Sequence, residues 1–196
     1  MAPFKDVTTE NVEKTTSRSD IVLLKEHNLN FVPIETTGDG NCLFHAVSIS
    51  LYGNESETAQ LKKIVAYYFA ENFELLKQKY PQFEGLFQSD QETFESCAIM
   101  GKWANTLTIL AIVNALRINF NSVYPPINGH DEFVHTTLNT TIIPFEGQTD
   151  KTVNILWSGW HLVDFGKSKV YQPNHFVALL VPEEANDLPI IESGKF

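Results

Sequence analysis

Apolar residues recur every three to four positions in the first part of the chain, and this spacing predicts helices. In Cys42–Tyr52, the side chains of Leu43, Val47 and Leu51 share one face, and Gly53 ends the helix. A short helix is expected to begin at Ile21–Leu24, and three longer ones are expected at about Glu57–Tyr80, Ser89–Met100 and Thr106–Leu116. The last of these is apolar nearly all round, which predicts a central position.

Beyond this last helix, short runs of β-branched and aromatic residues alternate with Pro, Gly, Asn and Asp, a pattern typical of strands. These runs are Arg117–Tyr124, Thr140–Ile143, Thr152–Trp157, His161–Phe165 and His175–Val181, and one earlier extended piece covers Phe31–Ile34. Helices followed by strands predict an α+β domain in which helices pack around a mainly antiparallel sheet.

The composition favours one globular domain. The chain has 196 residues, 43% of them hydrophobic and 19% charged, which is enough for a sizeable core. Residues 1–20 lack periodicity and are expected to form a flexible leader. The domain is then expected over residues 21–182, followed by a C-terminal tail over residues 183–196.

The charge narrows the classes of partner. A formal net charge of −10 argues against nucleic acid and anionic membranes, which both require a basic surface. No apolar stretch approaches the ~20 residues that span a bilayer, and the first 20 residues lack the apolar core of a signal peptide. Two cysteines cannot form a disulfide framework, so reduced thiols are expected. We therefore expect an intracellular, cytoplasmic protein (in the host cytoplasm if the source is viral or bacterial).

The most informative segment is a Gly-rich turn that leads directly into a helix at Cys42. Free N–H groups at such a junction hold an anion, and the helix dipole favours a thiolate over a thiol. The backbone N–H groups of Asp39, Gly40, Asn41 and Cys42 are placed as an oxyanion hole would require. This pattern predicts that Cys42 is a nucleophile, whereas Cys97 lies on an apolar helical face and is expected in the core.

His175 is the predicted general base. It begins a strand-like run far downstream, and pairing of that strand in a sheet could place it beside the helix that begins at Cys42. His45 is expected one helical turn beyond Cys42, beside the sulfur and not facing it. His161 is a weaker candidate. Two cysteines do not supply a zinc site, so neither a metal nor another cofactor is expected.

These motifs together resemble the ovarian-tumour (OTU) family of cysteine proteases, which belongs to the papain-like superfamily. The resemblance rests on Asp39–Phe44 with Leu51–Gly53, on Gly101–Trp103 before a buried helix, and on Asn174–Phe176. It implies a monomeric deubiquitinase that binds ubiquitin, polyubiquitin or a ubiquitin-like modifier and hydrolyses the isopeptide or peptide bond after the C-terminal Gly-Gly. Cys42 would be the nucleophile and His175 the general base. Ubiquitin's binding face and Arg-containing tail would suit an acidic surface.

The third catalytic residue departs from the family pattern. Many members place Asp or Asn two residues after the histidine to orient the imidazole, but this chain has Val177 there. Three solutions remain open. Asp39 reaches the histidine or stabilises the oxyanion loop, Asn174 or Asp164 orients the ring, or the enzyme runs as a Cys–His dyad. We favour Asp39 as the functional acid, a role compatible with capping the helix.

Two other functions also fit the sequence. One is a viral or mobile-element cysteine protease that cleaves its own polyprotein. The other is a non-catalytic ubiquitin-binding module, which Val177 favours and the intact pair of Cys42 and His175 opposes.

Overall fold

The structure is a computed structural model that describes residues 7–9, 12, 16–27, 29–127, 131–159, 162–165 and 168–182. For residues 18, 19, 162–165 and 168–171 it describes the backbone alone. The predicted C-terminal tail of residues 183–196 lies outside the described residues.

Helices occupy most of the first two thirds of the chain, and strands most of the last third. The helices are α1 (Arg18–Glu26), α2 (Cys42–Tyr52), α3 (Thr58–Lys79), the 3-10 helix η1 (Pro81–Leu86), α4 (Asp90–Ala98), α5 (Thr106–Leu116) and α6 (Glu132–Leu138). The strands are β1 (Val32–Ile34), β2 (Asn119–Val123), β3 (Thr140–Ile142), β4 (Thr152–Ser158), β5 (Leu162–Phe165), β6 (Ser168–Tyr171) and β7 (His175–Leu180).

Five strands form one mixed sheet in the order β1-β7-β4-β2-β3, and β5 pairs with β6 in a separate ribbon. Only the pair of β2 and β4 is parallel among the described strands of the main sheet; the others are antiparallel. In this register His175, the first residue of β7, lies opposite Ser158, the last residue of β4. The expected α+β domain with a mainly antiparallel sheet is confirmed.

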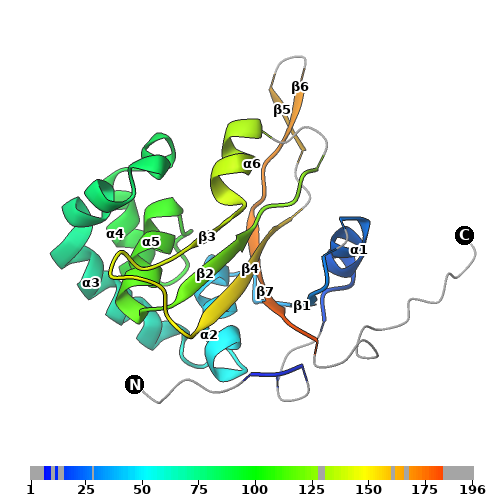
Figure 1. The fold of residues 1–196 in the computed structure, drawn as a ribbon, viewed down its shortest axis with the longest axis horizontal. Helices are drawn as coiled ribbons and strands as arrows, with labels where there is room; N and C mark the ends of the chain where they lie inside the picture. Colours follow the sequence, from blue (N-terminus) through cyan, green and yellow to red (C-terminus); the bar gives the residue numbers. More distant parts are fainter. Residues whose placement is uncertain are drawn as a thin grey trace, which may run out of the picture.

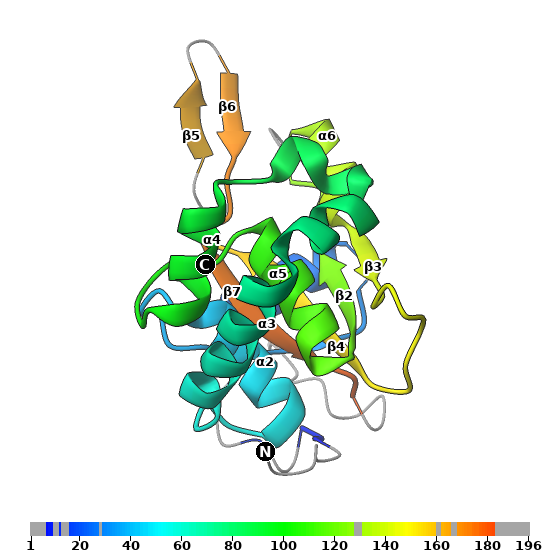
Figure 2. The same cartoon turned by 90° about the vertical axis from the view of Figure 1, so that its left-hand side faces the viewer.

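The two faces of β7 enter two different cores, because side chains alternate along a strand. Phe176, Ala178 and Leu180 join the larger core. The helices α2, α3 and α5 cover this face of the sheet (Figure 1, Figure 2). Val177 and Leu179 join a smaller core beneath α1. Figure 1 shows α1 on the opposite side of the sheet from α3, α4 and α5. The strand that begins with His175 therefore lies between α2 and α1.

The helix termini follow their sequence signals with one exception. Ser89 and Glu92 form the predicted capping box of α4, and Gly53 ends α2 in the left-handed conformation with φ 85°. Asn41 occupies the N-cap position of α2, but its side chain makes no cap hydrogen bond. That side chain instead accepts a hydrogen bond from the N–H of Gly101.

The structure also corrects the sequence analysis at three points. The expected leader of residues 1–20 is too long, because Thr16 bridges to Ile34, α1 begins at Arg18, and Asp20 is buried. Helix α6 and strand β6 were not predicted, because each is only a few residues long, although Asp131 caps α6 by accepting from the N–H of Val134.

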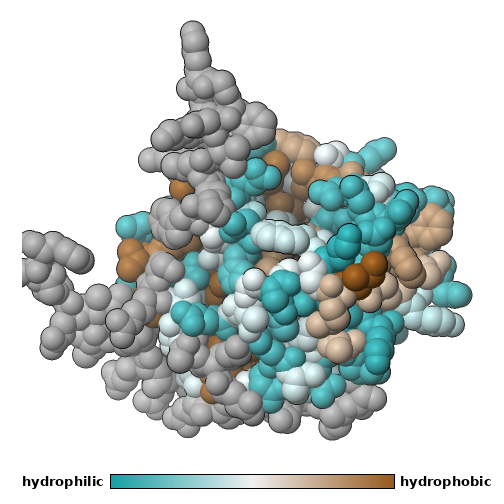
Figure 3. Space-filling view, turned by 180° about the vertical axis from the view of Figure 1, so that it is seen from behind, coloured by the Kyte–Doolittle hydropathy of each residue, from teal (hydrophilic) through white to brown (hydrophobic). Residues whose placement is uncertain are grey.

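The described surface is mostly polar. Figure 3 shows hydrophilic side chains over much of the described part of one face, with small hydrophobic areas between them. None of the described helices combines the length and the apolar character that crossing a bilayer requires.

Candidate active site

The fold brings Cys42 and His175 together although 132 residues separate them in the sequence. Cys42 is the first residue of α2, which packs against β7, and His175 is the first residue of β7. The backbone N–H of Phe176 hydrogen-bonds toward the Cys42 sulfur. A Cβ built on Gly38 would lie 3.9 Å from His175 Cε1, so the imidazole borders the loop that precedes Cys42. The predicted cysteine and histidine thus share one site.

The loop before Cys42 depends on a close approach to the turn that follows α4. Gly40 has φ 87°, and a Cβ on it would lie 2.2 Å from the carbonyl oxygen of Gly101, a distance that no side chain tolerates. The side-chain oxygen of Asn41 accepts a hydrogen bond of 2.8 Å from the N–H of Gly101. Asn41 therefore joins two loops in place of capping α2, and Gly40 is required because backbone occupies the position of its Cβ.

One of the four amides predicted for the oxyanion hole already has a partner. The N–H of Asn41 donates to Asp39 Oδ1 at 2.9 Å, a local turn typical of aspartate. This leaves the N–H groups of Asp39, Gly40 and Cys42 as the candidates for holding an oxyanion.

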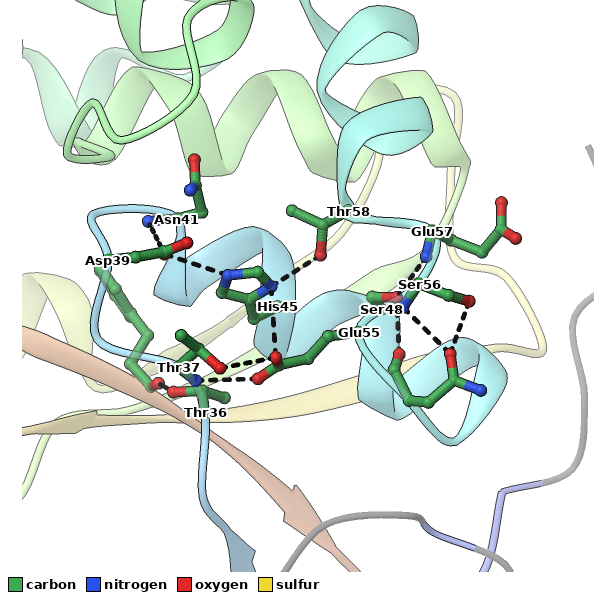
Figure 4. A network of polar contacts seen from close by, with 12 residues as sticks. Thr36, Thr37, Asp39, Asn41, His45, Ser48, Glu55, Ser56, Glu57 and Thr58 are labelled. Atoms are coloured by element: carbon green, nitrogen blue, oxygen red, sulfur yellow. Dashed lines mark hydrogen bonds and ion pairs between the residues drawn. The ribbon is translucent and has the colours of Figure 1, made fainter.

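Asp39 bonds to His45, and its described hydrogen bonds do not include one to His175. His45 Nε2 lies 3.0 Å from Asp39 Oδ1, and His45 Nδ1 lies 2.8 Å from Thr58 Oγ1 (Figure 4). Burial acts to raise the pKa of the Asp39 carboxyl, but the hydrogen bonds from Asn41 and the charge of His45 outweigh it and lower that pKa. Of the two roles predicted for Asp39, these contacts favour stabilising the loop.

Glu55 extends this network to the segment that precedes the Gly-rich loop. Its carboxylate accepts hydrogen bonds from the backbone N–H and the hydroxyl of Thr37, at 2.8 and 2.7 Å, and lies 3.8 Å from His45 Nδ1 (Figure 4). The loop from Thr37 to Asn41 is therefore fastened at both ends by polar contacts, to Glu55 on one side and to Gly101 on the other.

Thr36 contacts the His175 imidazole, and sequence analysis did not identify it. Its Oγ1 lies 2.8 Å from His175 Nε2 and donates a hydrogen bond of 2.5 Å to the carbonyl oxygen of Phe176. Because the single hydroxyl proton goes to that carbonyl, Oγ1 accepts from Nε2–H. The neutral ring then carries its proton on Nε2 and presents an unprotonated Nδ1, the state that a general base needs. No motif marks Thr36, which lies in an ordinary Glu-Thr-Thr-Gly run.

The other predicted candidates for orienting His175 have different surroundings. A Cβ on Gly159 would lie 1.9 Å from Asn174 Oδ1, so the Asn174 side chain lies against that glycine. The side chain of Asp164 and the whole of His161 lie outside the described residues. Val177 is 1% exposed in the core beneath α1, and Cys97 is fully buried as expected.

Burial shifts the pKa of each member of the pair toward its neutral form. It raises the pKa of the Cys42 thiol, which backbone N–H groups of Phe176 and Leu43 only partly oppose, and it lowers the pKa of His175. This differs from the thiolate that the helix dipole suggested. The physical reason is that Cys42 is only 6% exposed, so desolvation outweighs the dipole and the amides.

The described residues contain no group of three or more His, Cys, Asp and Glu side chains with the arrangement of a metal site. Within the described part of the chain, both ring nitrogens of His45 are engaged by Asp39 and Thr58.

Comparisons with known proteins agree with this architecture. A family model described as "Vertnin, OTU domain" matches residues 33–83 and 68–158, a span that includes Cys42 and ends before His175. Vertnin from Danio rerio is 28% identical over 189 residues, covering 81% of this chain and 26% of that protein. An "OVARIAN TUMOR DOMAIN-containing deubiquitinating enzyme 7" from Arabidopsis thaliana is 30% identical over 89 residues, covering 44% of this chain and 22% of that protein.

The chain thus spans about a quarter of the length of these two curated relatives. A solved structure of the OTUD1 OTU domain superposes with a TM-score of 0.49 and 22% identity, covering 82% of this chain and 91% of that chain.

The first prediction concerns the Gly-rich loop and compares two glycines with positive φ. Gly40→Ala should cost at least about 2 kcal/mol, because the new Cβ meets the Gly101 backbone in addition to the strained φ. Gly147→Ala, with φ 116° and nothing within 4 Å of its Cβ, should cost only about 1 kcal/mol. Denaturant unfolding measures both, and equal costs would argue against the close approach to Gly101.

The second prediction concerns the tautomer of His175. Thr36→Val removes the hydroxyl that accepts from Nε2–H, so the proton should no longer favour Nε2, whereas Thr36→Ser should keep it there. Long-range ¹H–¹⁵N correlation spectra of the ring report which nitrogen is protonated. An Nε2–H tautomer that persists unchanged in Thr36→Val would contradict the role of Thr36.

The third prediction concerns thiol reactivity. Iodoacetamide reacts with the thiolate, and burial raises the pKa of Cys97 to about 11, while Cys42 lies at a helix N-terminus with amides facing its sulfur. Cys42 should therefore be alkylated faster than Cys97 at every pH, with a midpoint above the ordinary value of a thiol. Peptide mass spectrometry across a pH series measures both rates. A Cys42 rate that is already maximal at neutral pH would show a preformed thiolate instead.

Proposed function

Because this chain belongs to the OTU domain family, with a family model matching more than half of it, we propose that it is a cysteine-type deubiquitinase. The observation that carries the proposal is the meeting of Cys42, at the start of α2, with His175, at the start of β7, beside a Gly-rich loop of backbone amides. The similarity to a plant protein named as a deubiquitinating enzyme supports the same substrate class.

The reaction begins from a neutral thiol and a neutral imidazole. As the Cys42 sulfur attacks the carbonyl carbon of the last glycine of Gly-Gly, the Cys42 proton moves to Nδ1 of His175. The carbonyl oxygen takes up negative charge, and the N–H groups of Asp39, Gly40 and Cys42 are the candidates to stabilise it. His175 then gives the proton to the leaving amine, and a thioester forms on Cys42.

Hydrolysis of the thioester completes the cycle. His175 takes a proton from water, the hydroxide oxygen attacks the thioester carbonyl, and the thiol of Cys42 is regenerated with the proton returned by His175. Thr36 keeps the imidazole in the tautomer that both steps need, and Asp39 fixes the loop through Asn41 and His45. The donor of the acyl group is ubiquitin or a ubiquitin-like modifier, and the acidic charge of this chain suits the modifier's Arg-containing tail.

A second candidate is a ubiquitin-binding module without catalysis. In its favour, burial raises the pKa of Cys42 and lowers that of His175, and both shifts oppose formation of a thiolate–imidazolium pair. The two candidates differ in whether Cys42 forms a covalent bond when the C-terminal tail of ubiquitin is bound.

The fourth prediction separates them with ubiquitin that carries a C-terminal propargylamide electrophile. We expect a covalent adduct at Cys42, lost in Cys42→Ala and slowed by at least ~100-fold in His175→Ala, the lower end for acid–base catalysis. Cys97→Ala is the matched control and should react like the unmodified chain, because Cys97 is fully buried in the core. Tight but non-covalent binding of the probe would favour the module.

A further inference from the structure

Asp20 is a buried carboxylate. It lies between the sheet and α1, on the face of the sheet to which β7, the strand that begins with His175, contributes Val177 and Leu179. It lies in the first turn of α1 and is 3% exposed. Its Oδ2 accepts a hydrogen bond of 2.6 Å from Ser17 Oγ, and its Oδ1 accepts one of 2.6 Å from Ser158 Oγ. Two hydroxyls therefore hold the carboxylate in one place. A buried carboxylate is costly without such partners, so its retention here requires a reason.

Ser158 connects this carboxylate to the active site. It is the last residue of β4 and lies directly opposite His175 in the antiparallel pair of β4 and β7. The N–H of Asn174 also donates to the carbonyl oxygen of Ser158 at 3.1 Å. The Asp20 carboxylate is thus bonded to the residue beside the catalytic histidine in the sheet.

The same face of β7 carries Val177, where many OTU proteases have their orienting Asp or Asn. Val177 is buried with Leu23 and Leu24 of α1 in the small core. The helix that covers Val177 is therefore the helix that delivers Asp20. Strand β7 thus has no carboxylate at position 177, and α1 instead places the Asp20 carboxylate on the same side of the sheet.

We propose that Asp20 is a positioning residue that replaces the missing acid of the triad by stabilising the protonated form of His175 through the Ser158 contact. This inference rests on the proposed catalytic role of His175. In the proposed arrangement, two residues share the functions of the usual acid, which are to fix the tautomer of the imidazole and to stabilise its protonated form. Thr36 fixes the tautomer at Nε2, and Asp20 supplies the negative charge that favours the imidazolium formed when Cys42 loses its proton.

Charged groups on several elements act on His175, and Asp20 is the strongest of those that favour its protonation. Burial lowers the pKa of His175; Asp20 opposes this most, followed by a backbone contact with Thr36, while Glu55 also raises the pKa and His45 lowers it. Glu55 is already bonded to Thr37, and His45 to Asp39 and Thr58.

The fifth prediction compares Asp20→Asn with Ser17→Ala. Asp20→Asn removes the charge and keeps the shape, so the pKa of His175 should fall. The acid limb of the pH–rate profile with the propargylamide probe should then move to lower pH while the plateau rate drops by roughly tenfold, as expected for removing a charge near the imidazolium. Ser17→Ala removes one hydrogen bond to Asp20 and keeps the charge, so it should lower the thermal midpoint with little change in that pKa.

NMR titration of the His175 ring gives the pKa without any substrate, so the two proposals fail separately. A pKa that falls in Asp20→Asn, together with no probe adduct in the unmodified chain, would support the coupling and reject the deubiquitinase. An adduct with an unchanged pKa in folded Asp20→Asn would overturn the role of Asp20 and leave it a structural residue of α1.

A titration of the unmodified chain covers the case in which Asp20→Asn does not fold. The ¹³C signal of the Asp20 carboxyl should then show an inflection at the pH where His175 titrates. A carboxyl signal that is flat through that pH would overturn the proposal.

Discussion

The central position of β7 in the sheet is the constraint on which the site depends. The strand pairs with β1 on one side and β4 on the other, and its two faces are buried in different cores. A shift of its register by one residue would exchange Phe176 and Val177 between these cores, which strongly disfavours any alternative pairing. The register therefore fixes His175 opposite Ser158, next to the N-terminus of α2, without any contribution from catalytic interactions.

The Gly-rich loop is the second rigid part, and polar contacts define it. Asn41 joins it to Gly101, Asp39 folds it back on Asn41, and Glu55 holds the preceding Thr37. His45 lies among these groups, bonded on both ring nitrogens. His45, one helical turn beyond Cys42, is thus part of the scaffold that places the loop.

Burial sets the electrostatic character of the pair. It raises the pKa of the Cys42 thiol and lowers that of His175, so both changes favour the neutral pair in the absence of substrate. In the proposed reaction the Cys42 proton would pass to Nδ1 of His175 as the sulfur attacks, because Thr36 accepts from Nε2–H.

Local sequence determined most of the helices and pointed to Cys42 and His175, which the fold brings into one site. The α2 helix has the predicted bounds because apolar residues recur every four positions until Gly53 ends the helix. The capping box of Ser89 and Glu92 starts α4 because its two partners lie within one helical turn. The third residue was not predictable in the same way. Thr36 contacts His175 across 139 positions, and Asp20 reaches Ser158 across 138. Neither residue carries a motif, since a hydroxyl or carboxylate acquires such a role only when strand pairing and the docking of α1 bring it to the histidine.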